Sequence, residues 1–512
     1  MARLPLVSET ERFGETAASF VSSSSMLPSC LKAQASLQPS LRSSRTLWTH
    51  SLARPFFALS RVNTLTFQKC FSASSFRFAP FRKDVLLAEK KFFSTNKPNF
   101  AEQQNANAEE ALPVLPSKSV GAWLMASSTL VLAIIVVGGI TRLTESGLSI
   151  TEWKPVTGLI PPLSPAQWEE EFERYKATPE FKLMNHSFQL EDFKRIFYME
   201  WGHRVLGRLI GVAFVGPLIY FAVKKRISKP LAVRLSTLAL LIGAQGGLGW
   251  YMVKSGLDDA LMDTPGAVPR VSQYRLAAHL GMALLLYAGM FSSGLAILKE
   301  WKYATGSKWN GLTTSAFTEA LKSPAVLRFK LRAWGLTGLI FLTALSGAFV
   351  AGLDAGLLYN EFPLMGGRLT PPREELMSPA YAKRADGSDK WRNIFENPTT
   401  VQFDHRVLAM ASYLSTALLF LRARSMRAAL PPATRTAATF AFGMVNVQLF
   451  LGITTLLHLV PTPLAVAHQA GSVLVLSAML HVLLTLRRPG ATAKAWRALH
   501  MQRLKGGVKP TK

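Results

Sequence analysis

Long apolar stretches recur along most of the chain and are separated by polar segments. Eight of them hold enough consecutive apolar residues to cross the roughly 30 Å of hydrocarbon in a bilayer as helices. They lie at about 120–141, 204–223, 233–253, 276–298, 333–353, 406–422, 434–459 and 464–486. The pattern predicts an all-α membrane protein with eight transmembrane helices, of which the second and sixth are short.

The connecting loops differ in charge. Loops 224–234 and 421–435 and the tail after 486 carry Lys and Arg but no acidic residue, whereas 142–202 and 353–404 are long and slightly acidic. The positive-inside rule, with an even number of spans, predicts both termini inside, in the matrix if the protein is mitochondrial. The long loops would then face the intermembrane space.

The net charge of +27 does not indicate nucleic-acid binding. The basic residues gather in the N-terminal stretch and in the loops on one side, and no basic face interleaved with aromatic residues is visible. Residues 16–83 contain nine Lys or Arg, many Ser and no acidic residue, which is typical of a mitochondrial transit peptide. A disordered basic tail is the alternative.

We therefore assign 1–97 to a transit peptide and disordered N-terminal region, and 98–118 to a polar linker. Both cysteines, Cys30 and Cys70, fall in the first of these segments. The mature chain is expected to contain no disulfide and no thiolate metal site.

Four histidines occupy matching places in the pattern, each at the same end of an even-numbered span. They are His203, His279, His405 and His468. A polar group near a bilayer is costly unless it is paired or functional, and with the expected topology all four lie at one depth near the outer surface. This arrangement predicts axial ligands for two haems, with a bis-histidine site for each.

The two halves of the chain resemble each other. EWGHRVLG in the first half corresponds to FDHRVLAM in the second, and the Q-x-x-x-G motif at 245–249 corresponds to that at 448–452. The sequences VVGGITRLTESGLS and FVAGLDAGLLYNEFP also correspond. We interpret this as a duplicated four-helix unit, in which each bundle offers one haem pocket from inward-facing side chains.

The duplication divides the mature chain into an N-terminal four-helix half at 119–298, a matrix connecting loop at 299–332, a C-terminal half at 333–488 and a basic matrix tail at 489–512. Each half is expected to hold one bis-histidine haem pocket.

The halves differ beside their first histidine. Glu200 stands three residues before His203, and Gln402 takes the matching place in the second half. An i, i+3 spacing puts both residues on one helix face. The first pocket is thus equipped for proton chemistry, whereas the pocket of the second half is typical of a plain electron-transfer site. Pairing with Arg204 or Arg208 is the alternative role for Glu200.

Other polar residues have less specific interpretations. Arg204 and Arg406, each directly after a candidate ligand, either contact haem propionates or extend to lipid headgroups. His186 lies in a long loop, and His458 and His481 have no counterpart in the repeat, so we expect structural roles for all three.

The segment GGITRLTESGLSITEWKPVTGLIPPLSPAQWEEEFERYKATPEFK, followed by FKRIFYMEWGHRVLGRLIG, resembles the mitochondrial heme A synthase family. The motifs QFDHRVLA and HQAG agree, and the resemblance covers roughly 118–488. Bacterial members of the family often carry cysteine pairs in their outer loops. This chain has none there, as in the mitochondrial branch.

The resemblance implies an oxidoreductase that converts heme O to heme A for cytochrome c oxidase. The methyl at ring position 8 is hydroxylated twice, and the resulting geminal diol loses water to give a formyl group. His405 and His468 are then the axial ligands of a resident heme b, His203 and His279 those of the substrate heme O, and Glu200 is catalytic. All four histidines would bind haem iron.

By the same resemblance, the enzyme is a multi-pass protein of the mitochondrial inner membrane. The expected electron donor is a ferredoxin with its reductase. The expected partners are heme O synthase and cytochrome c oxidase assembly factors, and a homo-oligomer is possible.

Two other functions fit the four histidines. One is a bis-haem b electron-transfer cytochrome, although such proteins often stack their haems across the membrane, which a single depth for all ligands argues against. The other is a haem transporter or chaperone. If Glu200 is not the catalytic group, Glu145 in the TRLTESG turn is the next candidate.

Overall fold

The computed structural model describes residues 113–154, 157–258, 262, 268–384 and 386–505. Contacts divide the chain into Met1–Thr95 and Asn96–Lys512, and all described residues belong to the second unit. The predicted transit peptide, both cysteines and most of the predicted linker therefore lie outside the described residues.

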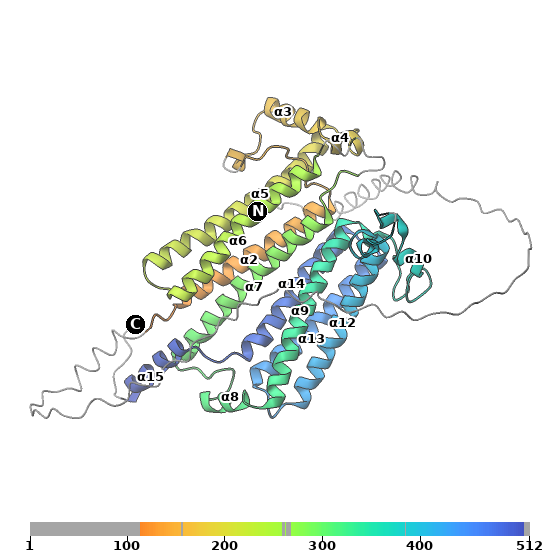
Figure 1. The fold of residues 1–512 in the computed structure, drawn as a ribbon. Coiled ribbons are helices and arrows are strands. Elements are labelled where there is room, and N and C mark those ends of the chain that lie inside the picture. Colours follow the sequence, from red (N-terminus) through yellow and green to blue (C-terminus); the bar gives the residue numbers. More distant parts are fainter. Residues whose placement is uncertain (1–112, 155–156, 259–261, 263–267, 385, 506–512) are drawn as a thin grey trace, which may run out of the picture. The chain divides into compact units, whose positions relative to one another are not determined.

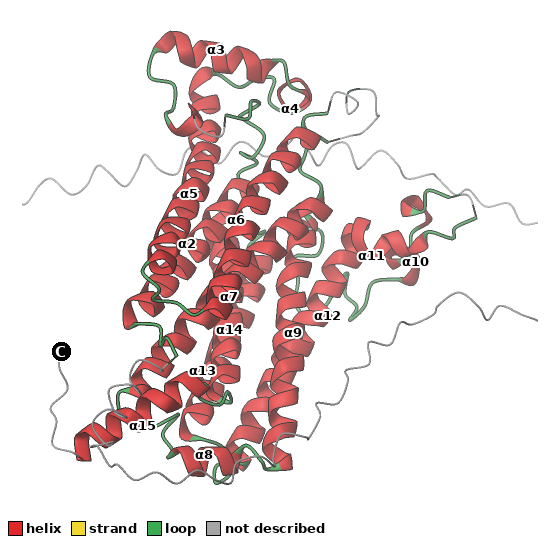
Figure 2. Ribbon diagram, turned by 60° about the vertical axis from the view of Figure 1, so that its left-hand side comes forward, coloured by secondary structure: helices red, strands yellow, loops and turns green. Residues whose placement is uncertain are grey.

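Eight helices in the described part of the chain are long and apolar enough to cross a membrane. They are α2 (Lys118–Leu143), α5 (Leu190–Val223), α6 (Lys229–Gly256), α7 (Gln273–Ala304), α9 (Pro324–Gly352), α12 (Pro398–Ser425), α13 (Pro432–Leu457) and α14 (Thr462–Thr485). Apart from two isolated bridges, the described residues of the chain form no β-structure (Figure 2). The predicted all-α fold with eight spans is confirmed. Helices suit this environment because a helix satisfies every backbone polar group within lipid.

Helices α5 and α12 begin well before the starts predicted for the second and sixth spans. The first turn of α5 contains Glu191 and Asp192, which interact favourably with the positive end of the helix dipole. Hydropathy marks only the apolar part of a helix, so these polar turns escaped the prediction. As a result, His203 and His405 lie inside continuous helices and not at helix ends.

Shorter helices cover the two ends of the bundle (Figure 1). We call one end the cap end and the other the tail end. The cap end carries α3 (Pro165–Lys176), α4 (Pro179–Leu183), α10 (Arg373–Leu376) and α11 (Asn393–Glu396). The tail end carries α8 (Thr314–Ala320) and α15 (Ala491–Lys505). The predicted basic tail thus contains a helix.

An aromatic cluster fastens the cap to the first half. Helix α3 packs on the polar start of α5 through rings that are buried in the interface. The cluster consists of Trp168, Phe172, Tyr175, Phe193 and Phe197. Rings at stacked and edge-on geometries stabilise such a contact beyond the area they bury. The cap therefore holds the segment that leads into His203.

The spans contact one another in two groups. Helix α2 packs against α5 and α7, and α6 packs against both α5 and α7. In the same way, α9 packs against α12 and α14, and α13 packs against both α12 and α14. Between the groups, α7 packs on α9 and α14 packs on α2.

A charged cluster joins the groups at the cap end. Arg142, at the end of α2, and Arg270, before α7, bind the carboxylate of Asp354 with N–O distances of 2.8 and 3.2 Å. Both guanidinium groups also donate to the carbonyl of Gly352. Asp354 has a left-handed backbone with φ of 52°, which directs the chain away from the end of α9.

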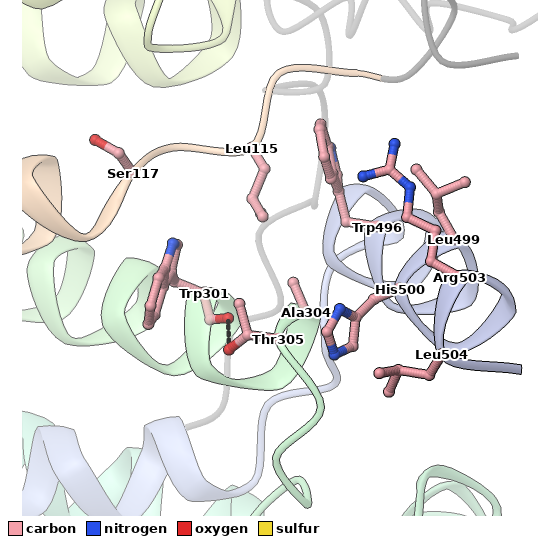
Figure 3. A pocket seen from close by; sticks show the side chains of 10 residues that line it. All are labelled: Leu115, Ser117, Trp301, Ala304, Thr305, Trp496, Leu499, His500, Arg503 and Leu504. Atoms are coloured by element: carbon pink, nitrogen blue, oxygen red, sulfur yellow. Dashed lines mark hydrogen bonds between the residues drawn. The ribbon is translucent and has the colours of Figure 1, made fainter. Parts of the chain in front are cut away.

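A cavity of about 320 Å³ lies at the tail end, between α7, α15 and the segment before α2 (Figure 3). Its lining includes Leu115, Trp301, Trp496 and His500. The indole of Trp496 donates to the carbonyl of Pro113 at 2.9 Å. The cavity is at the opposite end from the four candidate histidines, so it is not part of the candidate site.

The arrangement generates a topology prediction. Tags placed after residue 230 and at the C-terminus are expected on the matrix side, and a tag near residue 380 in the intermembrane space. The reason is the basic charge of the loops at the tail end. Protease access in mitoplasts checks it. Cleavage near 380 only after the inner membrane is ruptured would reverse the orientation.

Candidate functional site

The four candidate histidines lie on four different spans, α5, α7, α12 and α14, each in the part of its helix near the cap end. The ring centres of His203 and His279 are 6.5 Å apart, and the ring planes are inclined by 82°. His405 and His468 are also close enough to interact electrostatically. The structure thus brings the histidines of each half together.

Every one of these rings lies on a glycine of the preceding span. A Cβ added to Gly452 would lie 2.8 Å from the imidazole and push the ring aside, whereas a Cβ at the other three glycines would lie 3.4 to 3.6 Å from the ring, in van der Waals contact. The pairs are Gly138 with His203, Gly249 with His279, Gly347 with His405, and Gly452 with His468. The glycine at the end of each Q-x-x-x-G motif therefore makes room for a histidine.

The glutamine of the same motif fixes the histidine's own backbone. Gln245 donates to the carbonyl of His279 at 3.0 Å, and Gln448 donates to the carbonyl of His468 at 2.9 Å. Sequence comparison of the halves found the motif but not its role. The spacing places the glutamine and the glycine one turn apart on one helix face.

Glu200 is buried and its carboxylate is fully engaged. One oxygen accepts from the hydroxyl of Ser149 at 2.7 Å and from the backbone N–H of Ile150 at 2.8 Å. The other accepts two bonds from Arg204, at 3.1 and 2.7 Å. Four donor groups, two of them on the guanidinium of Arg204, hold this carboxylate in place. The expected pairing with Arg204 is present, whereas Arg208 instead donates to backbone carbonyls.

The matching position in the second half is neutral and less engaged. Gln402 is buried, with its amide nitrogen 3.4 Å from the carbonyl of Tyr359. Its oxygen has no hydrogen-bond partner among the described residues. The predicted difference between the halves is therefore also a difference in local structure. An anion is tightly held in one half, and an amide is loosely held in the other.

The arginines that follow the two histidines bind the cap loops. Arg204 donates to the carbonyls of Ile150 and Glu152, and Arg406 donates to those of Tyr359 and Leu364. These contacts direct both guanidinium groups to the protein's own loops, and Nε of Arg406 is buried without a partner among the described residues. A contact with haem propionates stays a prediction.

No cluster of three or more His, Cys, Asp or Glu that could hold a metal ion occurs in the described part of the chain. A metal bound by protein side chains alone needs more ligands than a pair of histidines. A haem iron needs only axial ligands from the protein, since the porphyrin supplies the others. Paired histidines suit haem in particular.

Residues 121–480 match the family model of the cytochrome oxidase assembly proteins, COX15-CtaA. The chain belongs to this family. A heme A synthase–mitochondrial ferredoxin fusion protein of Schizosaccharomyces pombe is 45% identical over 426 residues, which cover 82% of this chain and 67% of the relative. Heme A synthase COX15 of Saccharomyces cerevisiae is 46% identical over 396 residues, covering 77% and 80%. The human COX15 is 44% identical over 378 residues, covering 73% and 85%.

Three other histidines lie apart from the paired rings. His186 and His458 are exposed, and His481 lies in α14 thirteen residues beyond His468, toward the tail end. Glu145, the alternative catalytic candidate, is exposed just after α2 and has a left-handed backbone. Its exposure makes it a weaker candidate than the buried Glu200.

Sequence reasoning missed a second buried carboxyl in the cap, that of Glu180 in α4. It is 4% exposed, and one of its oxygens has no partner among the described residues. Burial raises its pKa to about 8, the hydroxyl of Tyr175 partly opposes this shift, and the charges of Glu200 and Glu145 add to it. An acidic residue in the first turn of a helix is common, so no local pattern indicated that this one would be buried.

Glu180 generates a pH prediction. Its ordinary pKa is 4.5 and its folded pKa is about 8, so its contribution to stability is fully present below 4.5 and is lost as the pH rises toward 8. Replacing Glu180 with Gln keeps a neutral group of similar size and should flatten this loss. Thermal unfolding of the purified protein between pH 5 and 8 measures it. Equal pH dependence in the wild type and the variant would contradict it.

Proposed function

We propose that this chain is a heme A synthase, an oxidoreductase that converts heme O to heme A by oxidising the methyl at ring position 8 to a formyl group. Relatives named heme A synthase, at 44–46% identity over most of the chain, support this proposal. The observation that carries it is the tightly held carboxylate of Glu200, one turn before a paired histidine, in only one of two matching sites.

We infer that the eight spans form two related four-helix halves. If α2, α5, α6 and α7 are exchanged for α9, α12, α13 and α14, every major contact within the first group becomes a contact within the second. The contact of α7 with α9 becomes that of α14 with α2. The four glycine–histidine pairs also exchange. Such correspondence supports a duplicated unit whose bundle interior holds a cofactor.

The spacing of the histidines suits a haem iron. A histidine nitrogen binds a first-row metal at about 2.0–2.1 Å, so two imidazoles on opposite sides of one iron have ring centres about 6 Å apart. The observed 6.5 Å between His203 and His279 fits this requirement. We assign these two residues to substrate heme O, and His405 with His468 to a resident heme b.

The resident heme b would supply one-electron transfer. Glu200 would act on the substrate in the first half. Because all its donors are in place, its carboxylate serves better as a fixed negative charge than as a mobile base. Positive charge that develops at the methyl carbon during oxidation is stabilised by such an anion. Each of two successive hydroxylations would draw on an external oxidant that takes two electrons from the methyl carbon, and loss of water from the resulting geminal diol would leave the formyl group.

The expected electron donor is a ferredoxin with its reductase. Support comes from the Schizosaccharomyces pombe relative, whose name describes a fusion of heme A synthase with a mitochondrial ferredoxin. The eight apolar helices and the mitochondrial relatives together support a membrane protein of the mitochondrion. We place it in the inner membrane with both termini in the matrix. Heme O synthase and cytochrome c oxidase assembly factors remain the proposed partners.

Pigment extraction from the purified protein distinguishes this function from its alternatives. A heme A synthase should yield heme O with hydroxylated or formyl products, beside heme b, when the extract is separated by HPLC. A b-type electron-transfer cytochrome should yield heme b alone. A haem transporter or chaperone should yield haem with no oxidised product, and either outcome would contradict the proposal.

Gly452 provides a test of the second site. The change Gly452→Ala places a Cβ 2.8 Å from Cε1 of His468, well inside van der Waals contact, and should displace the imidazole. We expect the reduced b-type absorbance of the purified protein to fall severalfold. Gly443→Ala is the matched control, because the same change in the same helix meets no atom within 4 Å. Equal haem content in both variants would sink the assignment of His468.

Glu200→Gln makes the first half imitate the second. Activity should fall by about 10²-fold or more, the usual scale for a lost catalytic acid–base or charge-stabilising group. Ligation by His203 should survive, so the variant should accumulate heme O or a hydroxylated intermediate. Extracted haem composition and the low-spin spectrum measure the two effects separately.

Ser149→Ala is the control for this substitution. It removes one donor to Glu200 but leaves the charge, so we expect a loss of about tenfold or less. If Glu200→Gln makes heme A at a near wild-type rate, Glu200 only anchors Arg204, and Glu145 becomes the candidate to examine.

A further inference from the structure

The Nδ1 nitrogen of the His405 ring has a hydrogen-bond partner on a neighbouring helix. It lies 2.7 Å from the hydroxyl oxygen of Ser346 on α9. The same hydroxyl lies 2.8 Å from the carbonyl of Thr343 and can donate its proton there, which leaves its oxygen free to accept an N–H from His405. A proton on Nδ1 leaves Nε2 with a free lone pair, which is the form of imidazole that binds iron.

His468 also has a side-chain contact at Nδ1, but its partner is an N–H donor. The side-chain nitrogen of Gln448 lies 3.1 Å from its Nδ1 and 2.9 Å from its carbonyl oxygen. Both imidazoles of the second half therefore have a side-chain contact at Nδ1. These contacts restrict rotation of the rings before any haem arrives.

The first half differs at the matching positions. Gly138 and Gly347 lie under the corresponding histidines, and the residue before each glycine is Val137 in one half and Ser346 in the other. Valine has no hydroxyl to accept an N–H. Nδ1 of His279 is buried without a partner among the described residues, since Gln245 reaches only its carbonyl.

We propose that Ser346 is a positioning residue that locks His405 for permanent haem binding, and that Val137 at the matching place leaves the first site able to exchange its haem. This inference rests on the proposed function. That function requires one site to take up heme O and release heme A while the other keeps heme b. A partner on the distal nitrogen of a histidine ligand fixes the ring, raises its basicity and strengthens metal binding about 10–100-fold.

The test uses the full-length protein purified in detergent. Ser346→Val copies the first half and should speed transfer of heme b to apomyoglobin about 10–100-fold. It should also raise the reduction potential of heme b, because a less basic imidazole stabilises the ferric state less. A Ser346→Thr variant keeps the hydroxyl and should restore both properties toward wild type.

Ser412→Ala is the matched control. It removes another buried hydroxyl of the same half, one that bonds to Thr343 and not to the histidine, and should leave both measurements unchanged. Unchanged haem loss and potential in Ser346→Val, or equal changes in Ser412→Ala, would overturn the proposal.

The reciprocal variant tests the first half, and it can be measured even if the Ser346→Val protein does not fold. Val137→Ser copies the second half at the position before Gly138 and should slow the loss of haem from the first site severalfold. An unchanged rate would overturn the proposed difference between the sites.

His405→Ala separates a failure of the haem assignment from a failure of the role proposed for Ser346. If that variant keeps normal b-type absorbance, the haem assignment itself is refuted. If it loses the absorbance while Ser346→Val changes neither haem transfer nor potential, only the role of Ser346 is refuted.

Discussion

An imidazole among apolar helices must have room for its ring and a use for its nitrogens, because an unbonded polar group there is costly. The structure provides both for each of the four histidines on α5, α7, α12 and α14. Each ring takes its room from a glycine on the preceding span. For the histidines of α7 and α14, a glutamine one turn before that glycine also holds the histidine's backbone. The pairing of the spans then brings two rings together in each half. Haem binding is the use that suits two facing imidazoles.

The cap closes the same end of the bundle with polar contacts that also serve the site. Arg204 and Arg406 follow their histidines and bind carbonyls of the cap loops, so each loop is tied to the helix that carries a candidate ligand. In the first half, Glu200 joins this network and holds Ser149 and Ile150 as well. The carboxylate that we assign to catalysis is thus also a structural anchor. Its substitution must be compared with variants that disturb only the anchor.

The sequence alone predicted the eight spans, because hydrophobic length and charge patterning are local properties of the chain. It also singled out the four histidines and the contrast between Glu200 and Gln402, because the halves could be compared with each other. The polar turns at the start of α5 escaped prediction because hydropathy marks only apolar residues, and part of their stability comes from the aromatic cluster with α3. Glu180 and Ser346 also escaped prediction. Their surroundings are built from segments distant in sequence, which no local pattern reveals.

The central claim is that each half binds one haem through its own pair of histidines. Low-temperature electron paramagnetic resonance of the fully loaded ferric protein tests it most directly. The wild type should show two low-spin signals. His279→Ala should remove one of them and His468→Ala the other, each without affecting its neighbour. If both substitutions remove the same signal, or if neither removes any, the claim that each half carries its own bis-histidine site is contradicted.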